Sequence, residues 1–146
     1  MKGYWNTADG VVVPEWIDRN GHMNMARYAA VFDRACDALL QRSGFASEDG
    51  DMTFVAGRLL MNHRRELMLG EEFVVWSGFS HVTADDVVMT HRLTVGQARR
   101  ATCDIQGTAF SLAKRAKVTL DDRQIARLNT FGVAGLRNPF DRLDRS

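Results

Sequence analysis

The stretch that decides the fold covers residues 14–44 and reads PEWIDRNGHMNMARYAAVFDRACDALLQRSG, a polar loop followed by an amphipathic segment. In its second half the apolar residues recur at the spacing of one helix face. Asn24 stands where a helix N-cap belongs, and Gly44 stands where a left-handed residue ends a helix. The apolar stripe consists of Tyr28, Val31, Phe32, Ala35, Leu39 and Leu40. We therefore predict a helix that lays one apolar face on another layer of structure.

The loop before this helix concentrates polar side chains. Asp18, Gly21, His22 and Asn24 precede the helix start, where backbone N–H groups lack intrahelical acceptors. An aspartate with an ordinary pKa of about 3.9 is ionised at neutral pH and acts as a nucleophile without a separate base. The helix N-terminus supplies N–H donors and about half a positive charge for an oxyanion. This arrangement indicates chemistry on a carbonyl carbon.

Length and composition indicate a single domain that spans residues 1–146. The chain is 45% hydrophobic, enough to bury a core without disulfide or metal staples. Its net charge of +1 argues against a broad attraction to nucleic acid or to an anionic membrane. Cys36 and Cys103 form no CxxC pair and are expected to be free thiols in a reducing compartment. With no apolar leader and no window near the ~20 apolar residues of a membrane span, we expect a cytoplasmic protein.

Most of the remaining chain has the pattern of strands joined by tight turns. Alternating apolar residues predict strands over residues 11–13, 53–67, 73–82, 87–95 and 100–113. Asp121 and Asp122 indicate the start of a short helix, and an irregular tail is expected from about Asn129. One long helix beside an antiparallel sheet is an α+β plan.

The loop and helix together resemble a known family. The run Asp18-Arg19-Asn20-Gly21-His22-Met23-Asn24, with Tyr28 and Phe32 following, resembles the acyl-CoA thioesterases of the hot-dog fold, relatives of 4-hydroxybenzoyl-CoA thioesterase. The resemblance extends over about residues 11–113. It implies a curled antiparallel sheet wrapped around the long helix, and a homodimer or homotetramer with the site at the dimer interface. It also implies an acyl-CoA substrate and no metal or other cofactor.

The resemblance assigns catalytic roles to four positions of the loop. Asp18 attacks the thioester or activates water for the attack, and the backbone N–H of Met25 polarises the carbonyl. Asn24 is expected chiefly to cap the helix, with a contact to substrate or water as the alternative. His22 either orients the loop or takes part in catalysis. Spacing alone favours a turn-capping role for Asp18, and the family match favours catalysis.

The phosphates of coenzyme A need cationic or N–H partners, and the family binds the nucleotide on the surface near strand ends. His91, the one polar residue on an apolar strand face, is either a satisfied core histidine or part of the pocket lining. The histidines show no metal-ligand spacing, so no metal is expected. The candidate substrate-binding residues are Arg99, Arg100, Lys114, Arg115 and His91.

The sequence leaves open both the acyl group of the substrate and the reaction. The amino-acid sequence of the loop is similar to that of thioesterases of carnitine and betaine breakdown. This similarity makes betainyl-CoA a candidate substrate. An aromatic box would hold its trimethylammonium group, with Trp5, Trp16 and Trp76 as candidates. The alternative functions are an acyl-CoA binding module without turnover and a hydratase acting on enoyl thioesters.

Overall fold

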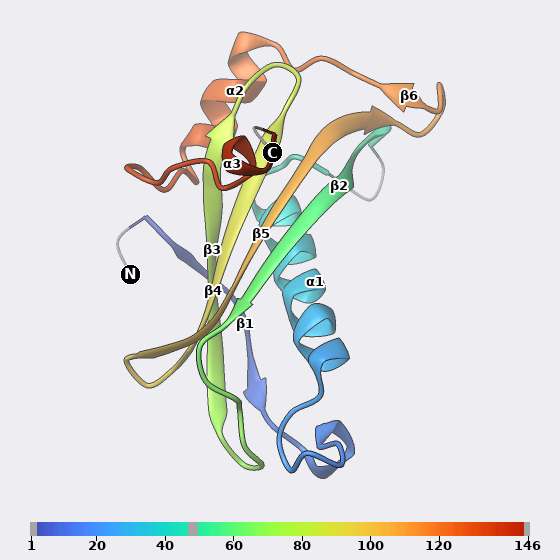
Figure 1. The fold of residues 1–146 in the computed structure, drawn as a ribbon. Coiled ribbons are helices and arrows are strands. Elements are labelled where there is room, and N and C mark those ends of the chain that lie inside the picture. Colours follow the sequence, from blue (N-terminus) through green and yellow to red (C-terminus); the bar gives the residue numbers. More distant parts are fainter. Residues whose placement is uncertain (1–2, 47–49, 145–146) are drawn as a thin grey trace.

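The computed structural model describes residues 3–46 and 50–144, which form one antiparallel sheet with a long helix packed against it (Figure 1). The sheet order is β1-β3-β4-β5-β2, with β6 paired to the outer part of β5. The described elements are β1 (Trp5–Val11), the 3-10 helix η1 (Pro14–Trp16), α1 (Met25–Arg42), β2 (Met52–His63), β3 (Glu72–Val82), β4 (Val87–Val95), β5 (Ala98–Ser111), β6 (Ala116–Lys117), α2 (Asp122–Asn129) and α3 (Phe140–Asp144). This architecture confirms the predicted α+β class.

The strands of the sheet twist and curl around α1. Adjacent strands pair antiparallel throughout, and the register of each central pairing shifts once, for example between Leu93 and Thr94 of β4. Such bulges increase the local twist of a strand. In Figure 1 the long strands β2 and β5 cross the helix at an angle and rise together to the top of the molecule. The concave face left by this curl receives α1.

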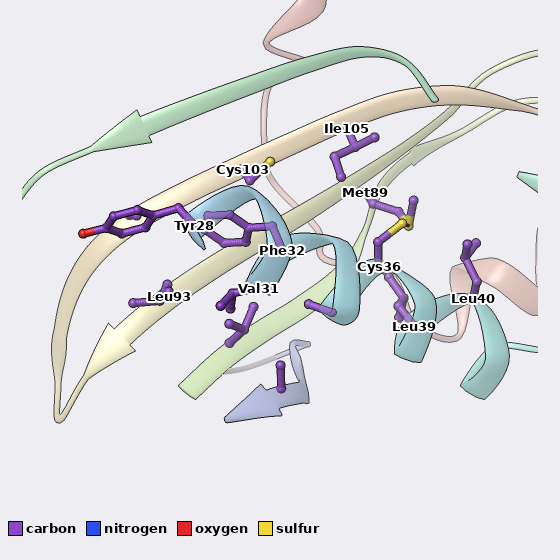
Figure 2. Packing of buried hydrophobic residues seen from close by; sticks show 14 of the residues in the cluster. Tyr28, Val31, Phe32, Cys36, Leu39, Leu40, Met89, Leu93, Cys103 and Ile105 are labelled. Atoms are coloured by element: carbon purple, nitrogen blue, oxygen red, sulfur yellow. Dashed lines mark hydrogen bonds between the residues drawn. The ribbon is translucent and has the colours of Figure 1, made fainter. Parts of the chain in front are cut away.

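The core lies between α1 and the concave face of the sheet. The predicted stripe of α1 is buried as expected, with Phe32 exposed by only 1% and Leu39 by 0%. Figure 2 shows these side chains pointing at residues of β4 and β5, among them Met89 and Ile105. Each large apolar side chain removed from water in this way contributes about 1.5–3 kcal/mol.

Both ends of α1 are closed as the sequence predicts. The Asn24 side-chain oxygen accepts a hydrogen bond of 2.9 Å from the backbone N–H of Ala26. At the other end Gly44 takes a positive φ of 73°, and the N–H of Phe45 then donates to the carbonyl of Leu40 at 3.0 Å. A left-handed residue at this place favours glycine because a side chain would be strained there.

The first strand differs from the prediction. The β-branched run at residues 11–13 indicated a strand there, but β1 covers Trp5–Val11 and Val13 already caps η1 at Pro14. Because β1 is an edge strand with polar residues along it, it lacks the apolar alternation that marks an inner strand. The second strand is also shorter than predicted, ending at His63, since the chain bends away where Arg64 N–H binds the Arg100 carbonyl at 2.8 Å.

The segment after α2 is more ordered than the irregular tail expected from its composition. The backbone of Phe79 in β3 accepts from Val133 at 2.8 Å and donates to Phe131 at 2.9 Å. Gly78 makes this approach possible, because a Cβ there would lie 2.6 Å from a Val133 methyl carbon. Phe140 opens α3 and is only 1% exposed. Long-range contacts therefore hold this segment to the sheet.

Candidate active site

The loop between η1 and α1 is held by backbone hydrogen bonds, so its side chains have fixed positions. Ile17 and Met23 form an isolated antiparallel bridge, and between them the Gly21 N–H donates to the Asp18 carbonyl at 3.0 Å. Gly21 has a φ of 83°, which glycine adopts at little cost. Met23 is buried, and its N–H donates to the Leu67 carbonyl at 2.8 Å. The loop is thereby tied to the segment that follows β2.

The Asp18 carboxylate accepts a hydrogen bond on each oxygen. The backbone N–H of Asn20 donates to Oδ1 at 2.8 Å, and the Asn24 side-chain amide donates to Oδ2 at 3.0 Å. These two donors, the Asn20 N–H first, stabilise the charged form and lower the pKa of Asp18. The nearby charges of His22 and Arg19 act in the same direction. Asp18 is therefore an ionised carboxylate at neutral pH.

Asn24 serves two neighbours with one amide group. Its oxygen accepts from the Ala26 N–H and caps the helix, and its nitrogen donates to the Asp18 carboxylate. The expected cap is therefore present, and the contact of Asn24 with substrate or water stays a prediction. In the part of the chain that the structure describes, the Met25 N–H donates no hydrogen bond outside the helix, and as the first residue of α1 it has no acceptor within the helix. That N–H is thus available to a carbonyl oxygen, as expected for the first residue of a helix.

A cavity of about 560 Å³ opens beside this loop. In Figure 1 the green segment that leaves β2 runs toward the end of the molecule at which the blue start of α1 lies. The cavity is lined by Asp18, Asn20, His22, Met23, Asn24, Met25, Tyr28, His63, Arg64, Arg65 and Glu66. The four loop residues predicted from sequence thus share one cavity.

The far wall of the cavity comes from the segment after β2. The buried Tyr28 hydroxyl accepts from the Leu67 N–H at 2.8 Å, and its ring packs edge-on against His63 at 4.6 Å. Burial raises the pKa of Tyr28, so its hydroxyl stays protonated. The sequence pattern did not single out His63, Arg64 or Arg65, which also line this cavity. The direction of their side chains depends on the bend after β2, which local sequence does not encode.

Arg100 does not face the cavity or the solvent, which corrects its prediction as a phosphate ligand. It is 7% exposed and forms an ion pair with Glu71, with a second Glu71 contact at 3.1 Å. It also donates to the Glu66 carbonyl at 2.8 Å. Glu71 in turn accepts from the Met68 N–H at 2.9 Å. Arg100 therefore holds the turn between β2 and β3 through the Glu71 carboxylate and the Glu66 carbonyl.

The other predicted substrate residues lie in different places. Arg99 is exposed near the start of β5, next to Arg100, whose carbonyl accepts from the backbone N–H of the cavity residue Arg64. Lys114 and Arg115 are exposed in the turn after the other end of β5. The Arg115 guanidinium lies 5.5 Å from the ring centroid of Phe110. Lys114 and Arg115 are thus remote from Asp18 along the whole length of the strand.

His91 is a core residue and does not line the cavity. It is fully buried, and its Nδ1 lies 2.6 Å from the Ser77 hydroxyl, while Nε2 has no partner among the described residues. Burial lowers the pKa of His91 to about 3, so the ring is neutral in the folded protein. His91 is therefore a core histidine, as one of the two expectations had it, and of its two ring nitrogens only Nδ1 has a hydrogen-bond partner.

The three tryptophans do not form an aromatic box. Trp5 lies against Phe131, Trp16 lies against Phe73, and Trp76 donates from its indole nitrogen to a threonine hydroxyl of β4. None of the three is among the residues that line the cavity beside Asp18.

The structure offers neither a reactive thiol nor a metal site among the residues that it describes. Cys36 and Cys103 are free, and burial raises the pKa of each thiol to about 12. Within residues 3–46 and 50–144, no three His, Cys, Asp or Glu side chains gather in the manner of a metal site. Over the same residues, no helix has the length and apolarity needed to cross a membrane.

The fold and the loop define a hot-dog protein of the thioesterase type, and comparison with known proteins agrees. Residues 12–128 match the thioesterase-like superfamily, so the chain belongs to that family. A betainyl-CoA thioesterase from Pseudomonas aeruginosa is 44% identical over 51 residues. That match covers 35% of this chain and 32% of the relative, so it spans about a third of the relative's length.

Solved structures confirm the hot-dog fold. The probable thioesterase YbaW from Escherichia coli superposes with a TM-score of 0.73 and 17% identity, covering 87% of this chain and 98% of that one. A putative thioesterase from Pseudomonas putida gives a TM-score of 0.74 and 23% identity, covering 88% and 84% respectively. The predicted sheet wrapped around one long helix is therefore confirmed as a hot-dog fold.

Proposed function

We propose that this protein hydrolyses a small or medium acyl-CoA thioester to the free acid and coenzyme A. The observation that carries the proposal is the meeting of the ionised Asp18 carboxylate and the Met25 N–H at one cavity. The first group attacks a thioester carbonyl carbon, and the second receives the negative charge that develops on its oxygen. Membership of the thioesterase-like superfamily supports the same reaction.

Two routes fit these groups. In the first, an Asp18 oxygen bonds to the carbonyl carbon, the C–S bond breaks, and water then hydrolyses the mixed anhydride to the acid while a proton goes to the thiolate. In the second, Asp18 takes a proton from water as the water attacks, and the sulfur leaves with a proton. The lowered pKa of Asp18 makes it a weaker base and a weaker nucleophile alike, so it does not choose between the two routes.

The working unit is proposed to be a homodimer joined through β2. This strand ends the sheet order, so its outer backbone groups have no neighbouring strand within the described chain. Its Val55 and Leu59 are 44% and 54% exposed, and Met25 at the mouth of the cavity is 72% exposed. A second copy paired along β2 would cover these apolar groups and supply a further wall to the cavity.

For the acyl group we propose only its size class, small or medium. The local identity to a betainyl-CoA thioesterase makes betainyl-CoA one candidate, over the third of that relative that matches. A straight-chain series of increasing length tests how much of the cavity beside Tyr28 the acyl group occupies. A steep fall in kcat/KM past one length would define the pocket.

Thiol release from a panel of acyl-CoAs tests the proposal, with betainyl-CoA and straight-chain acyl groups included. We expect turnover by the wild type and a loss of about a thousandfold or more with Asp18→Asn, which keeps the size of the side chain but removes its charge. Asp9→Asn is the matched control, because Asp9 lies on β1 and outside the cavity. Equal rates for wild type and Asp18→Asn would refute the catalytic role.

The alternative functions give different results in the same assay. A binding module would show binding of acyl-CoA by calorimetry, and it would release thiol from no member of the panel. A hydratase would add water to crotonyl-CoA and change its absorbance without thiol release. Either result would replace the hydrolase proposal.

A further inference from the structure

His63, the last residue of β2, lies in the cavity wall beside the first turn of α1. Its backbone pairs with Ala101 of β5, and its side chain is exposed and lines the cavity. The imidazole meets the Tyr28 ring edge-on, with the ring centroids 4.6 Å apart and the ring planes at 90°. Tyr28 stands three residues after Met25 on α1, and side chains at that spacing share one face of a helix. The imidazole is therefore on the side of α1 where the Met25 N–H opens into the cavity.

The imidazole of His63 is held by packing while its two nitrogens stay accessible. Tyr28 is buried, and its hydroxyl, which points away from Phe32 in Figure 2, accepts from the Leu67 N–H at 2.8 Å. An edge-on contact with so well fixed a ring favours one orientation of the imidazole. Within residues 3–46 and 50–144, hydrogen bonds to a histidine ring occur at His81 and His91 and none at His63. The His63 nitrogens can therefore exchange a proton with a molecule in the cavity.

The covalent route of the proposed reaction needs such a group. Once Asp18 carries the acyl group as a mixed anhydride, its carboxylate cannot also take the proton of the attacking water. Arg64 and Arg65 line the same cavity, but guanidinium groups stay protonated in proteins. The Tyr28 hydroxyl stays protonated as well, because burial raises its pKa. None of these three side chains can act as a base at neutral pH.

Two other side chains of the cavity, His22 and Glu66, are placed or built less well for this task. His22 belongs to the loop of Asp18, and its charge lowers the pKa of that carboxylate. Water, however, enters the position that the sulfur has left, which lies away from the attacking oxygen. Glu66 follows β2 and lies closer to that position, but an ordinary carboxylate is a far weaker base than an imidazole. The imidazole of His63 satisfies both conditions.

We propose that His63 is the general base that activates water for hydrolysis of the acyl group carried by Asp18. This inference rests on the proposed function and selects its covalent route. As the C–S bond breaks, the protonated ring gives its proton to the sulfur and becomes neutral. The ring then takes a proton from water, the water oxygen bonds to the acyl carbon, and the Asp18 carboxylate leaves with its electron pair. The free acid is released and the ring is protonated again, so atoms and charges balance over the cycle.

Rapid-quench kinetics of His63→Gln, with an acyl-CoA that the wild type hydrolyses, test the inference. We expect a burst of thiol equal to the concentration of protein, followed by a steady-state kcat about a hundredfold below that of the wild type. The burst arises because the variant still forms the anhydride but hydrolyses it slowly. Intact-protein mass after quenching should show one added acyl group, and peptide mapping should place it on Asp18.

Two further readouts separate proton transfer from a merely structural role. In the wild type, kcat should rise with pH between about pH 5 and 8 as an imidazole loses its proton, and His63→Gln should lack this rise. Imidazole added to the buffer should raise the steady-state rate of His63→Ala at least about tenfold, because it replaces the missing base. A residue that only shapes the cavity would give neither result.

His81→Gln is the matched control, since His81 lies on β3 and outside the cavity of Asp18. It should show the wild-type rate, pH profile and absence of a slow second phase. A wild-type rate in His63→Gln, or a slow rate with neither a burst nor rescue by imidazole, would overturn the inference. If Asp18→Asn is inactive at the same time, the hydrolase proposal stands and only the role of His63 fails. Absence of turnover by the wild type would overturn both.

Discussion

At the scale of single residues, Asn24 links the stability of α1 to the charge state of Asp18. Its amide oxygen caps the helix and its amide nitrogen helps to lower the pKa of Asp18. Serine at this position would keep a capping oxygen but lose the donor to Asp18, whereas alanine would lose both. The two tasks can therefore be separated by substitution.

We predict that Asn24→Ala lowers the free energy of unfolding by about 1 kcal/mol and that Asn24→Ser changes it by only a few tenths. Both variants should raise the pKa of Asp18 toward its ordinary value of 3.8, because the charged form loses a donor. The acid limb of kcat/KM should move upward in pH by the same amount in both. Urea unfolding and a pH–rate profile measure the two effects, and an unmoved acid limb in Asn24→Ser would contradict the link.

His91 makes stability depend on pH through its burial. Its pKa is about 3 in the folded state and about 6.5 when exposed, so the unfolded chain binds more protons between these values. The free energy of unfolding should thus fall as pH drops from about 6.5 toward 3, by at most about 1.4 kcal/mol per pH unit from this group. At higher pH the ring is neutral in both states and contributes no slope.

Urea midpoints at pH 7, 6 and 5 in the wild type and in His91→Gln measure this contribution. The glutamine side chain of the variant can still bind the Ser77 hydroxyl but does not titrate, so the stability of the variant should change less over the range. The comparison stops at pH 5 because carboxylates with lowered pKa values, such as Asp51 and Glu71, lose their charge only below that range. Equal slopes in the two proteins would assign the pH dependence to other groups.

At the scale of elements, the turn between β2 and β3 forms the outer wall of the cavity and depends on Arg100. Its guanidinium joins the Glu71 carboxylate to the Glu66 carbonyl from a nearly buried position. The same turn carries Leu67, whose backbone is bonded to both Met23 and Tyr28. Loosening Arg100 should therefore disturb the loop of Asp18 through this shared backbone.

We predict that Arg100→Gln lowers the free energy of unfolding by about 3 kcal/mol, because it leaves Glu71 with a poorly compensated, partly buried charge. Arg99→Gln, one residue earlier and exposed, should change stability by less than about 0.5 kcal/mol. Chemical denaturation of the two variants makes the comparison. Similar stability losses in both would mean that the ion pair is not the source of the effect.

At the scale of the whole molecule, the exposed edge of β2 is expected to be the contact between two copies. Cross-strand pairing would satisfy its outer backbone groups, and the exposed Val55 and Leu59 would be covered along the edge. A dimer of this kind would also bring a second chain against the exposed Met25. Assembly and activity should therefore be lost together.

We predict that the wild type elutes at twice the mass of one chain and that the double variant Val55→Lys, Leu59→Lys elutes as a monomer with little thioesterase activity. Like charges placed on paired edges oppose their association. Leu112→Lys serves as the control. Leu112 is similarly exposed, at 49%, but it lies in the turn after β5 and not on β2. Size-exclusion chromatography with light scattering reports the mass. A wild type that is an active monomer would contradict the interface.

The sequence by itself determined the long helix, its cap and the loop that precedes it. These features rest on contacts between residues a few positions apart, such as the side chain of Asn24 and the N–H of Ala26, so periodicity and spacing are sufficient to predict them. The same locality explains why Asp18, His22 and Asn24, which lie within seven residues of one another, line one cavity, and their catalytic roles stay predictions.

Only the tertiary structure decided which distant residues complete that site. Arg99 and Arg100 are adjacent in sequence, yet Arg99 is exposed and Arg100 is buried in an ion pair with Glu71. Successive residues of a strand point to opposite faces, and a bulge in the pairing of β4 with β5 leaves Arg100 without a direct partner on β4. The sequence shows no sign of that bulge. Strand register and the bend after His63 depend on pairings many residues apart, which local patterns do not encode.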